Sequence, residues 1–321
     1  MEIRELGKTG IRVSALGLGG HEFHPDGRLK GFSDDSKAAV LPGYVNNDFG
    51  GPTRQALVQR AIEAGVNYFD ATMDPEVKAL GECLSRSAGK ASVLMQCRPQ
   101  AMCYHYDAGN KSLADLSRLE PEVRRLIALS GRSKIDVLNF GIEAGAFASD
   151  LDYLKKIARN IQTLKEKKLI RLAACDSLRS GESVYLRLME SRCFDIVWLN
   201  FGPLCPFPAH RIFPLAEELE MGVAVREAFS KGNLFRAALA DGTIQSPSDI
   251  AGPALRWILS HVEVSTLVMG VKNATEFDLN FAAVSHELTE QDIELLDRVR
   301  AGPAFNAALN EQEKAFRPPE T

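Results

Sequence analysis

The chain has 321 residues, of which 45% are apolar and 25% charged, ordinary values that exclude a disordered, collagen-like or coiled-coil chain. Its 38 basic and 42 acidic side chains give a net charge of -4 without a basic run. Composition therefore gives no support for a nucleic-acid or anionic-membrane partner. We expect a small molecule as the partner, and the sequence leaves the oligomeric state open.

No apolar stretch is long enough to cross a membrane, and the first residues lack the profile of a secretory signal. These features predict a cytoplasmic protein. Six scattered cysteines form no Cys-x-x-Cys pair, which indicates reduced thiols and no structural metal site.

Short apolar runs alternate with longer segments of helical period along the whole chain. The eight runs are Val13–Leu18, Val66–Phe69, Ser92–Met95, Ile135–Phe140, Ile170–Cys175, Phe194–Leu199, Val223–Val225 and Ser265–Met269. Nearly continuous apolar runs are typical of strands that are buried on both faces of a parallel sheet. Eight such β/α units predict the α/β class and one closed (β/α)8 TIM barrel spanning residues 1–321.

The clearest helical segments are Ala56–Ala64, Asp152–Lys168, Leu215–Met221 and Ala254–Ser260. Gly65 and Gly222 stand where helix C-caps are expected.

Two segments flank the first barrel strand. Before it, short alternating runs on either side of Gly7-Lys8-Thr9-Gly10 predict a β-hairpin. After it, the Gly- and Pro-rich stretch from His21 to Pro52 predicts a long lid loop. Such a loop leaves the C-terminal end of a strand, where barrels build active sites, so we expect His21 or His24 near Asp70.

Several segments, taken in order, resemble the aldo-keto reductase family over nearly the whole chain. They are residues 4–10, 14–19, 64–70 with 80–82, 135–138, 168–171 and 270–272 with Asn280. The resemblance implies reduction of carbonyls with NADP or NAD by an Asp, a Tyr, a Lys and a His. The tyrosine protonates the carbonyl oxygen, and the lysine, paired with the aspartate, lowers its pKa.

The catalytic positions of this chain depart from the family pattern. Asp70 matches the aspartate, but Pro75 stands where the tyrosine belongs and Gly141 stands at the histidine. The third strand supplies no lysine, and the nearest candidates are Gln96, Cys97 and Arg98. The resemblance therefore indicates a divergent member with a degenerate active site.

The cofactor positions are altered as well. Asp176 and Ser177 align with the Ser-Asn pair that binds the nicotinamide amide, Trp198 with a glutamine, and Arg226 with the stacking tyrosine. An arginine is repelled by an oxidised nicotinamide. The candidate contacts at the other end of the cofactor are Ser230, Lys231, Lys272 and Asn280.

Our catalytic candidates are Asp70, His21, His24 and Arg98, each with an alternative. Asp70 either acts chemically or only pairs with Arg98 at the barrel mouth, and the histidines bind a metal, act as acid or base, or are plain lid residues. The Tyr104-His105-Tyr106 segment either replaces the lost acid or packs the loop.

Positive charge at the barrel mouth either binds an anionic ligand or is neutralised by carboxylates of the chain itself. The cations concerned are Arg98, Arg226 and Lys231, and the internal carboxylates are Asp70, Asp176 and Glu227.

Three functions remain open. The first is an oxidoreductase of non-standard mechanism, linked to NAD(P), that acts on a polar or anionic carbonyl or sugar-like molecule. The second is a lyase or isomerase that uses Asp70 with a lid histidine. The third is a catalytically inactive small-molecule-binding protein, because barrels host many chemistries.

Overall fold

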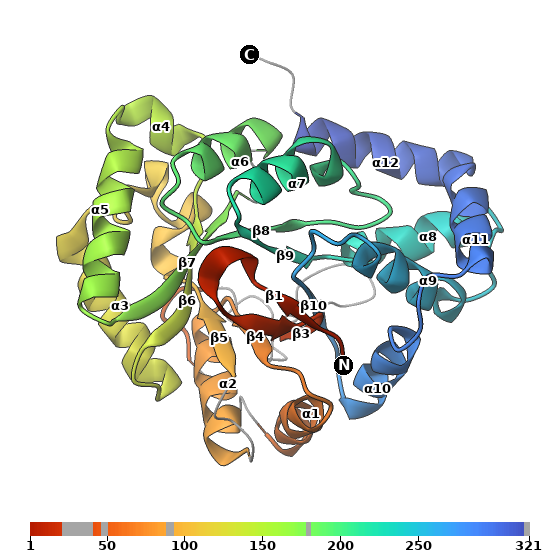
Figure 1. The fold of residues 1–321 in the computed structure, drawn as a ribbon, viewed down its shortest axis with the longest axis horizontal. Helices are drawn as coiled ribbons and strands as arrows, with labels where there is room; N and C mark the ends of the chain where they lie inside the picture. Colours follow the sequence, from red (N-terminus) through yellow and green to blue (C-terminus); the bar gives the residue numbers. More distant parts are fainter. Residues whose placement is uncertain (21–40, 46–50, 88–92, 178–180, 318–321) are drawn as a thin grey trace.

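The computed structural model describes residues 1–20, 41–45, 51–87, 93–177 and 181–317. Eight parallel strands close into a barrel in the order β10-β3-β4-β5-β6-β7-β8-β9, which confirms the predicted (β/α)8 architecture (Figure 1). The barrel strands are β3 (Leu16–Gly19), β4 (Tyr68–Ala71), β5 (Leu94–Cys97), β6 (Ile135–Gly141), β7 (Ile170–Asp176), β8 (Ile196–Asn200), β9 (Gly222–Arg226) and β10 (Thr266–Gly270).

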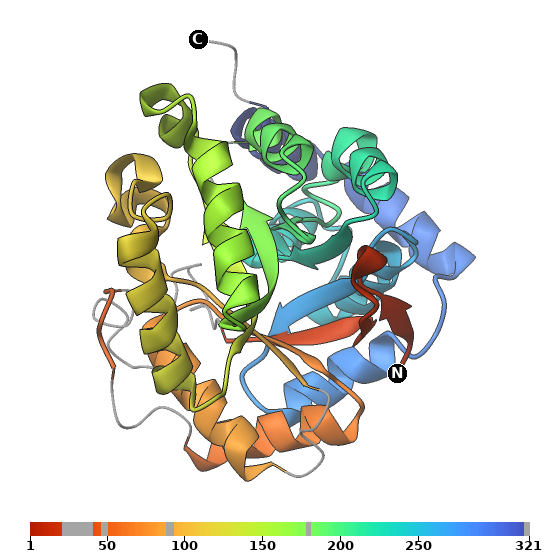
Figure 2. The same cartoon turned by 60° about the vertical axis from the view of Figure 1, so that its left-hand side comes forward.

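Helices surround the barrel, and Figure 2 shows α3 and α5 running along the outside of the sheet. The helices are α1 (Pro52–Glu63), α2 (Asp74–Arg86), α3 (Leu116–Ser130), α4 (Gly145–Ser149), α5 (Tyr153–Glu166), α6 (Gly181–Glu190), α7 (Pro208–Glu218), α8 (Asn233–Ala240), α9 (Pro247–Leu259), α10 (Ala274–Ala283), α11 (Glu290–Arg300) and α12 (Pro303–Phe316). The last two lie outside this ring, where α11 packs on α9 and α12 packs on α8 and α6. No helix among the described ranges is both long and apolar enough to cross a membrane.

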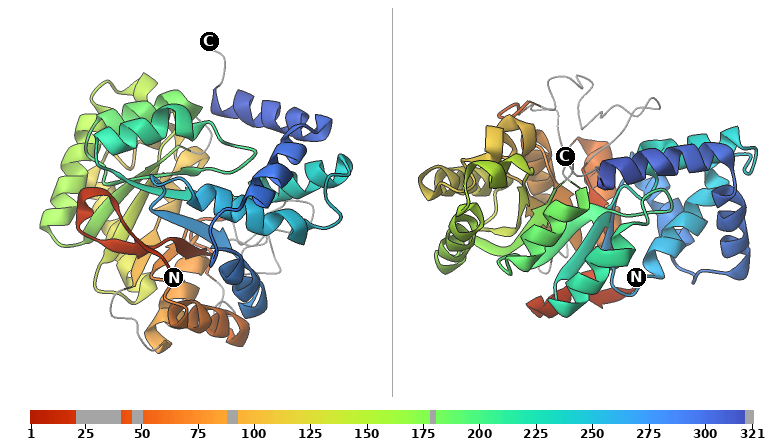
Figure 3. Two further views of the ribbon diagram at one scale, coloured as in Figure 1. Left: turned by 45° about the vertical axis from the view of Figure 1, so that its right-hand side comes forward. Right: turned by 90° about the horizontal axis from the view of Figure 1, so that it is seen from above.

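The predicted N-terminal hairpin is present. Strands β1 (Ile3–Glu5) and β2 (Arg12–Ser14) pair antiparallel, with Arg4 opposite Val13, and the turn contains a 3-10 helix, η1 (Gly7–Thr9). In the right-hand view of Figure 3 the hairpin, in red, lies at one end of the barrel. Its apolar side chains join those inside the barrel, a cluster of Leu6, Ile11, Val13, Tyr68, Leu94, Val137, Leu172, Ala174, Ile196, Trp198, Ala224 and Val268. The hairpin therefore closes the N-terminal end of the barrel.

Several predicted boundaries were wrong, and α7 and α9 each begin seven residues before the predicted Leu215 and Ala254. The first apolar run does not form one strand from Val13, because Val13 belongs to the hairpin and barrel strand β3 begins only at Leu16. Gly222 is not a helix cap but the first residue of β9, and a Cβ there would lie 2.6 Å from the side chain of Leu6. The close approach of the hairpin therefore requires a glycine at position 222. Gly65, at φ +91°, follows α1 as expected.

Alternation along the strands determines which side chains reach the open end. Inward-facing Tyr68, Leu94 and Leu172 are each followed on their strands by inward-facing polar residues. Toward the carboxyl ends these are Asp70 on β4, Gln96 on β5, Asn139 on β6, Asp176 on β7, Asn200 on β8 and Arg226 on β9. The barrel is thus apolar at the hairpin end and polar at its C-terminal mouth.

Candidate functional site

Asp176, at the end of β7, is the centre of the polar mouth. Its side chain is fully buried and accepts two hydrogen bonds from Arg226, at 2.6 Å to Oδ2 and 3.0 Å to Oδ1. Arg98, one residue beyond β5, donates to Oδ2 at 2.7 Å. The phenol of Tyr104 also donates to Oδ2, and that of Tyr185 donates to Oδ1 at 3.1 Å. We call these five residues the Asp176 cluster.

The charges of the Asp176 cluster stabilise one another. Burial would raise the pKa of Asp176, but Arg226 and Arg98 outweigh it and hold the pKa below its ordinary value. Burial raises the pKa of the Tyr104 phenol well above its ordinary value, more strongly than Arg98 lowers it. Tyr104 therefore keeps its proton beside an ionised carboxylate.

Asp70 lies in a separate hydrogen-bonded chain at the end of β4. Gln96 Nε2 donates to Asp70 Oδ1 at 2.7 Å, and Thr72 donates to Oδ2 at 3.1 Å. Tyr68 in turn donates to Gln96 Oε1 at 2.7 Å. Our alternative that Asp70 pairs with Arg98 is wrong, because Arg98 points to Asp176.

The structure also shows what lies at the positions that the resemblance assigns to the other catalytic residues. Pro75 lies in the first turn of α2, so the chain is already helical where the tyrosine is expected. Of the three candidates for the lysine position, Gln96 makes the contact with Asp70. At Gly141 a Cβ would lie only 2.7 Å from Cζ of Tyr104, so the Tyr104 ring fills the space where a histidine side chain would begin.

The loop after β5 holds Tyr104 in this place. Its short 3-10 turns are η3 (Gln100–Met102), η4 (Tyr104–Tyr106) and η5 (Ala108–Asn110). Tyr104 has a φ of +51°, which is an uncommon conformation for a bulky side chain. The Asn110 amide donates to the carbonyl oxygens of Met102, Tyr104 and Asp107. The loop is therefore built to hold a strained tyrosine, a feature that often marks functional sites.

The predicted cofactor residues fall into two groups. Asp176, Ser177 and Trp198 are buried at the mouth, and the Arg226 guanidinium lies 5.5 Å from the centre of the Trp198 ring. The other group lies in the segments that follow β9 and β10. Ser230 is buried in η6 (Ser230–Gly232), Lys231 forms an ion pair with Glu227 at 3.6 Å, Lys272 is exposed, and Asn280 is half-buried in α10.

The lid prediction falls largely outside the described residues, which include neither His21 nor His24. Part of the segment is described: Gly43 N–H donates to Asp74 Oδ2 at 2.7 Å, at the first residue of α2. Among the described residues, no three His, Cys, Asp or Glu side chains gather as metal ligands.

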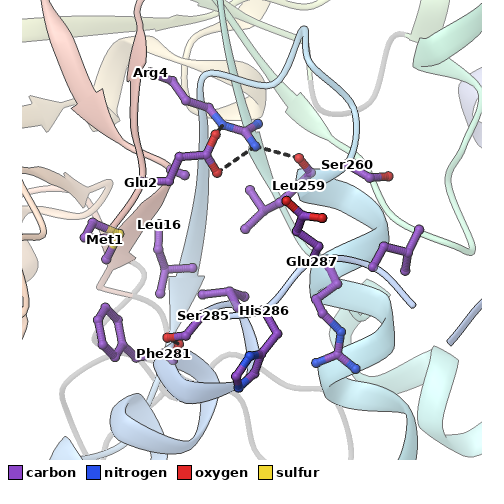
Figure 4. Close-up of a pocket in the computed structure, with 14 residues that line it drawn as sticks. Met1, Glu2, Arg4, Leu16, Leu259, Ser260, Phe281, Ser285, His286 and Glu287 are labelled. Atoms are coloured by element: carbon purple, nitrogen blue, oxygen red, sulfur yellow. Dashed lines mark hydrogen bonds and ion pairs between the residues drawn. The ribbon is translucent and has the colours of Figure 1, made fainter. Parts of the chain in front are cut away.

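A large crevice lies away from the mouth. It has a volume of about 690 Å³ and is bordered by the hairpin, the end of α9 and the α10–α11 connection (Figure 4). Arg4 lines it but is already bonded to Glu2 and to the carbonyl oxygen of Leu259, as the figure shows. The mouth therefore remains the better candidate for chemistry, although the hollow beside Asp70 is small.

An eight-stranded parallel barrel with polar side chains at the strands' carboxyl ends is the architecture of TIM-barrel enzymes. The sequence profile of the Aldo/keto reductase family matches residues 245–301. The fold matches aldo-keto reductase AKR11C1 from Bacillus halodurans, holo form, with a TM-score of 0.70 and 16% identity, covering 95% of this chain and 97% of that one. The apo form of the same protein gives a TM-score of 0.66 at the same identity and coverage.

A search of curated proteins finds no match to the sequence. The resemblance to the aldo-keto reductase family is nevertheless confirmed, in sequence over residues 245–301 and in fold over nearly the whole chain.

Sequence reasoning missed part of the site. It did not select Gln96 over its neighbours, and it gave no role to Tyr185 or Asn200. Tyr185 lies on α6, where a buried tyrosine is indistinguishable from core packing. Asn200 accepts from Arg226 Nε at 2.8 Å, and its position at the end of β8 was the one available signal.

Proposed function

We propose that the chain is a divergent oxidoreductase of the aldo-keto reductase type that acts on a polar or anionic carbonyl or sugar-like small molecule. The observation that carries the proposal is the convergence of Asp70, Gln96, Arg98, Tyr104 and Asp176 at the mouth of a barrel of this fold. The matched segment 245–301 adds support. A small-molecule partner also agrees with the acidic net charge of -4, which disfavours a nucleic acid.

NAD(P) suits one end of this site and not the other. Lys272 is exposed, and Lys231 precedes Gly232 at the N-terminus of α8, an arrangement that attracts phosphate. At the nicotinamide end both oxygens of Asp176 are fully engaged, and Arg226 lies where an aromatic ring is expected. Because the nicotinamide does not fit the arrangement of these side chains, we assign it no step in the reaction.

The chain's own residues support binding and proton handling. Arg98 has a donor left for a carbonyl oxygen at the mouth, and Tyr104, whose pKa is raised by burial, keeps a proton that must leave its hydrogen bond to Asp176 before it reaches the carbonyl oxygen. Asp70, bonded to Gln96 and Thr72, supplies a second carboxylate on β4, the strand beside β5, which leads to Arg98. We therefore place Tyr104 as the candidate acid and Asp70 as the candidate base.

A small-molecule-binding protein without catalysis is the second candidate. It is favoured by one observation, the Arg226–Asp176 ion pair at the nicotinamide position. Breaking such a buried pair costs about 3 to 5 kcal/mol, which would weaken binding of a nicotinamide correspondingly.

Turnover assays separate the two candidates. The purified protein is incubated with NADPH and a panel of sugars, keto acids and hydroxy aldehydes, and in the reverse direction with NADP+ and polyols, while the absorbance of NADPH is followed. The oxidoreductase proposal requires NADPH-dependent turnover of at least one polar carbonyl, with the nicotinamide admitted by displacement of Arg226 from Asp176, and a loss of at least tenfold in Tyr104→Phe but not in Tyr106→Phe. If no substrate changes the absorbance although it binds, the oxidoreductase proposal fails and the second candidate stands.

A further inference from the structure

The Asp176 cluster contains more positive than negative charge. Two guanidinium groups, Arg98 and Arg226, face one carboxylate, and the three side chains are 6%, 15% and 0% exposed. The other nearby acids do not face these arginines: Glu227 pairs with Lys231 at 3.6 Å, and Asp70 accepts from Gln96 at 2.7 Å, whereas both guanidinium groups are directed to Asp176. Within the described ranges the cluster therefore has one uncompensated cation, which is costly in a buried site.

Arg98 is the cation with unused hydrogen-bonding capacity. Arg226 donates through Nε to Asn200 and through both terminal nitrogens to Asp176. Arg98 donates to a single described residue, Asp176, through one terminal nitrogen. Its Nε atom is buried without a partner among the described residues, although a guanidinium has five N–H donors.

Two further polar atoms beside the cluster have no partner in the part of the chain that the structure describes. They are Ser177 Oγ, directly after Asp176, and Trp198 Nε1, on the ring beneath Arg226. Buried polar atoms are nearly always hydrogen-bonded, to protein, water or a ligand. The surplus charge and these atoms therefore point to a polar occupant that bears a negative charge.

We propose that Arg98 binds the carboxylate of a small monoanionic ligand, so that the protein's ligand is a keto acid, hydroxy acid or acidic sugar. A single carboxylate neutralises one surplus cation, and its planar geometry matches the guanidinium fork. Binding of a phosphate dianion would instead leave the cluster with one surplus negative charge. The inference rests on the proposed function only in placing the ligand at the barrel mouth.

Binding of monocarboxylates without any dinucleotide tests this inference. Calorimetric titrations use glyoxylate, pyruvate, lactate and glucuronate, with the neutral analogues glycolaldehyde and glucose and with inorganic phosphate. We expect at least one monocarboxylate to bind at least tenfold more tightly than its neutral analogue and than phosphate. Equal binding of the neutral analogues, tighter binding of phosphate, or no carboxylate binding overturns the proposal.

Variants of Arg98 locate the site. Arg98→Met is expected to weaken carboxylate binding at least tenfold, Arg98→Lys to weaken it less, and Arg124→Met, on the exposed face of α3, to leave it unchanged. Arg98→Lys keeps the test decisive if Arg98→Met does not fold. Carboxylate binding that is unchanged in the folded Arg98 variants contradicts the proposal. Because no dinucleotide is present, this failure is distinguishable from a failure of the turnover assays.

Discussion

Replacing Asp176 by Asn tests whether the mouth is held together by a buried ion-pair cluster. Arg98 and Arg226 are 6% and 15% exposed, so neither guanidinium regains water when the carboxylate becomes neutral. Removing one partner of a buried pair costs about 3 to 5 kcal/mol. With an unfolding entropy of about 2 cal/mol/K per residue, a chain of 321 residues is expected to melt about 4 to 7 °C lower.

Thermal unfolding at pH 7, followed by circular dichroism, measures this shift. The matched control is Asp297→Asn, which removes an exposed carboxylate bonded to Arg300 and is expected to shift the melting temperature by less than about 1 °C. An Asp176→Asn variant that melts as the parent does would refute the buried-pair reasoning.

Four further predictions concern the same site. The pKa of Asp176 is lower in the fold than its ordinary value, so the stabilisation by its carboxylate is fully present above the ordinary carboxyl pKa and is lost as the pH falls through the lowered value. The stabilities of the parent and of Asp176→Asn should therefore converge in acid. A difference in stability that stays constant at all pH values would contradict this. Gly141→His should cost about 1 to 3 kcal/mol by overpacking Tyr104, and Tyr104→Ala should relieve that cost in a double-mutant cycle; additive effects would show that the two positions are independent. Gln96→Leu should cost about 1 to 3 kcal/mol in urea unfolding, because it removes the acceptor of the Tyr68 hydroxyl and one of the donors to the Asp70 carboxylate; an unchanged midpoint would contradict this. Simple aromatic aldehydes should be reduced with NADPH at well under about 1 per second, because loss of positioned acid catalysis lowers the rate about 10² to 10⁴-fold. Reduction at ordinary enzymatic rates would contradict the loss of the family's catalytic residues.

The barrel was predictable because its signal is local. A strand buried on both faces needs a run of apolar residues, and each of the eight runs overlaps a barrel strand. The start of β3 was not predictable in this way, since Val13 and Leu16 look alike in sequence although one lies in the hairpin and the other in the barrel.

The site was predictable only in part, because its partners are chosen by long-range geometry. The sequence placed Asp70, Arg98, Asp176 and Arg226 at strand ends, and the structure has them there. Which carboxylate each arginine meets depends on the order of strands around the barrel, and Arg98 is separated from Asp176 by 78 positions in the chain. The fit of Tyr104 against Gly141 likewise joins two segments whose contact no local pattern reveals.

Our central proposal is that the Asp176 cluster occupies the place that the aldo-keto reductase resemblance assigns to the nicotinamide. Titration with NADPH and with its adenosine bisphosphate half, followed by the fluorescence of Trp198 beside Arg226, tests this most directly. A Trp257→Phe background removes the other tryptophan signal. The account predicts that NADPH binds no more tightly than its adenosine half and that the nicotinamide does not quench Trp198. Binding of NADPH at least tenfold tighter than the half, with quenching of Trp198, would contradict it.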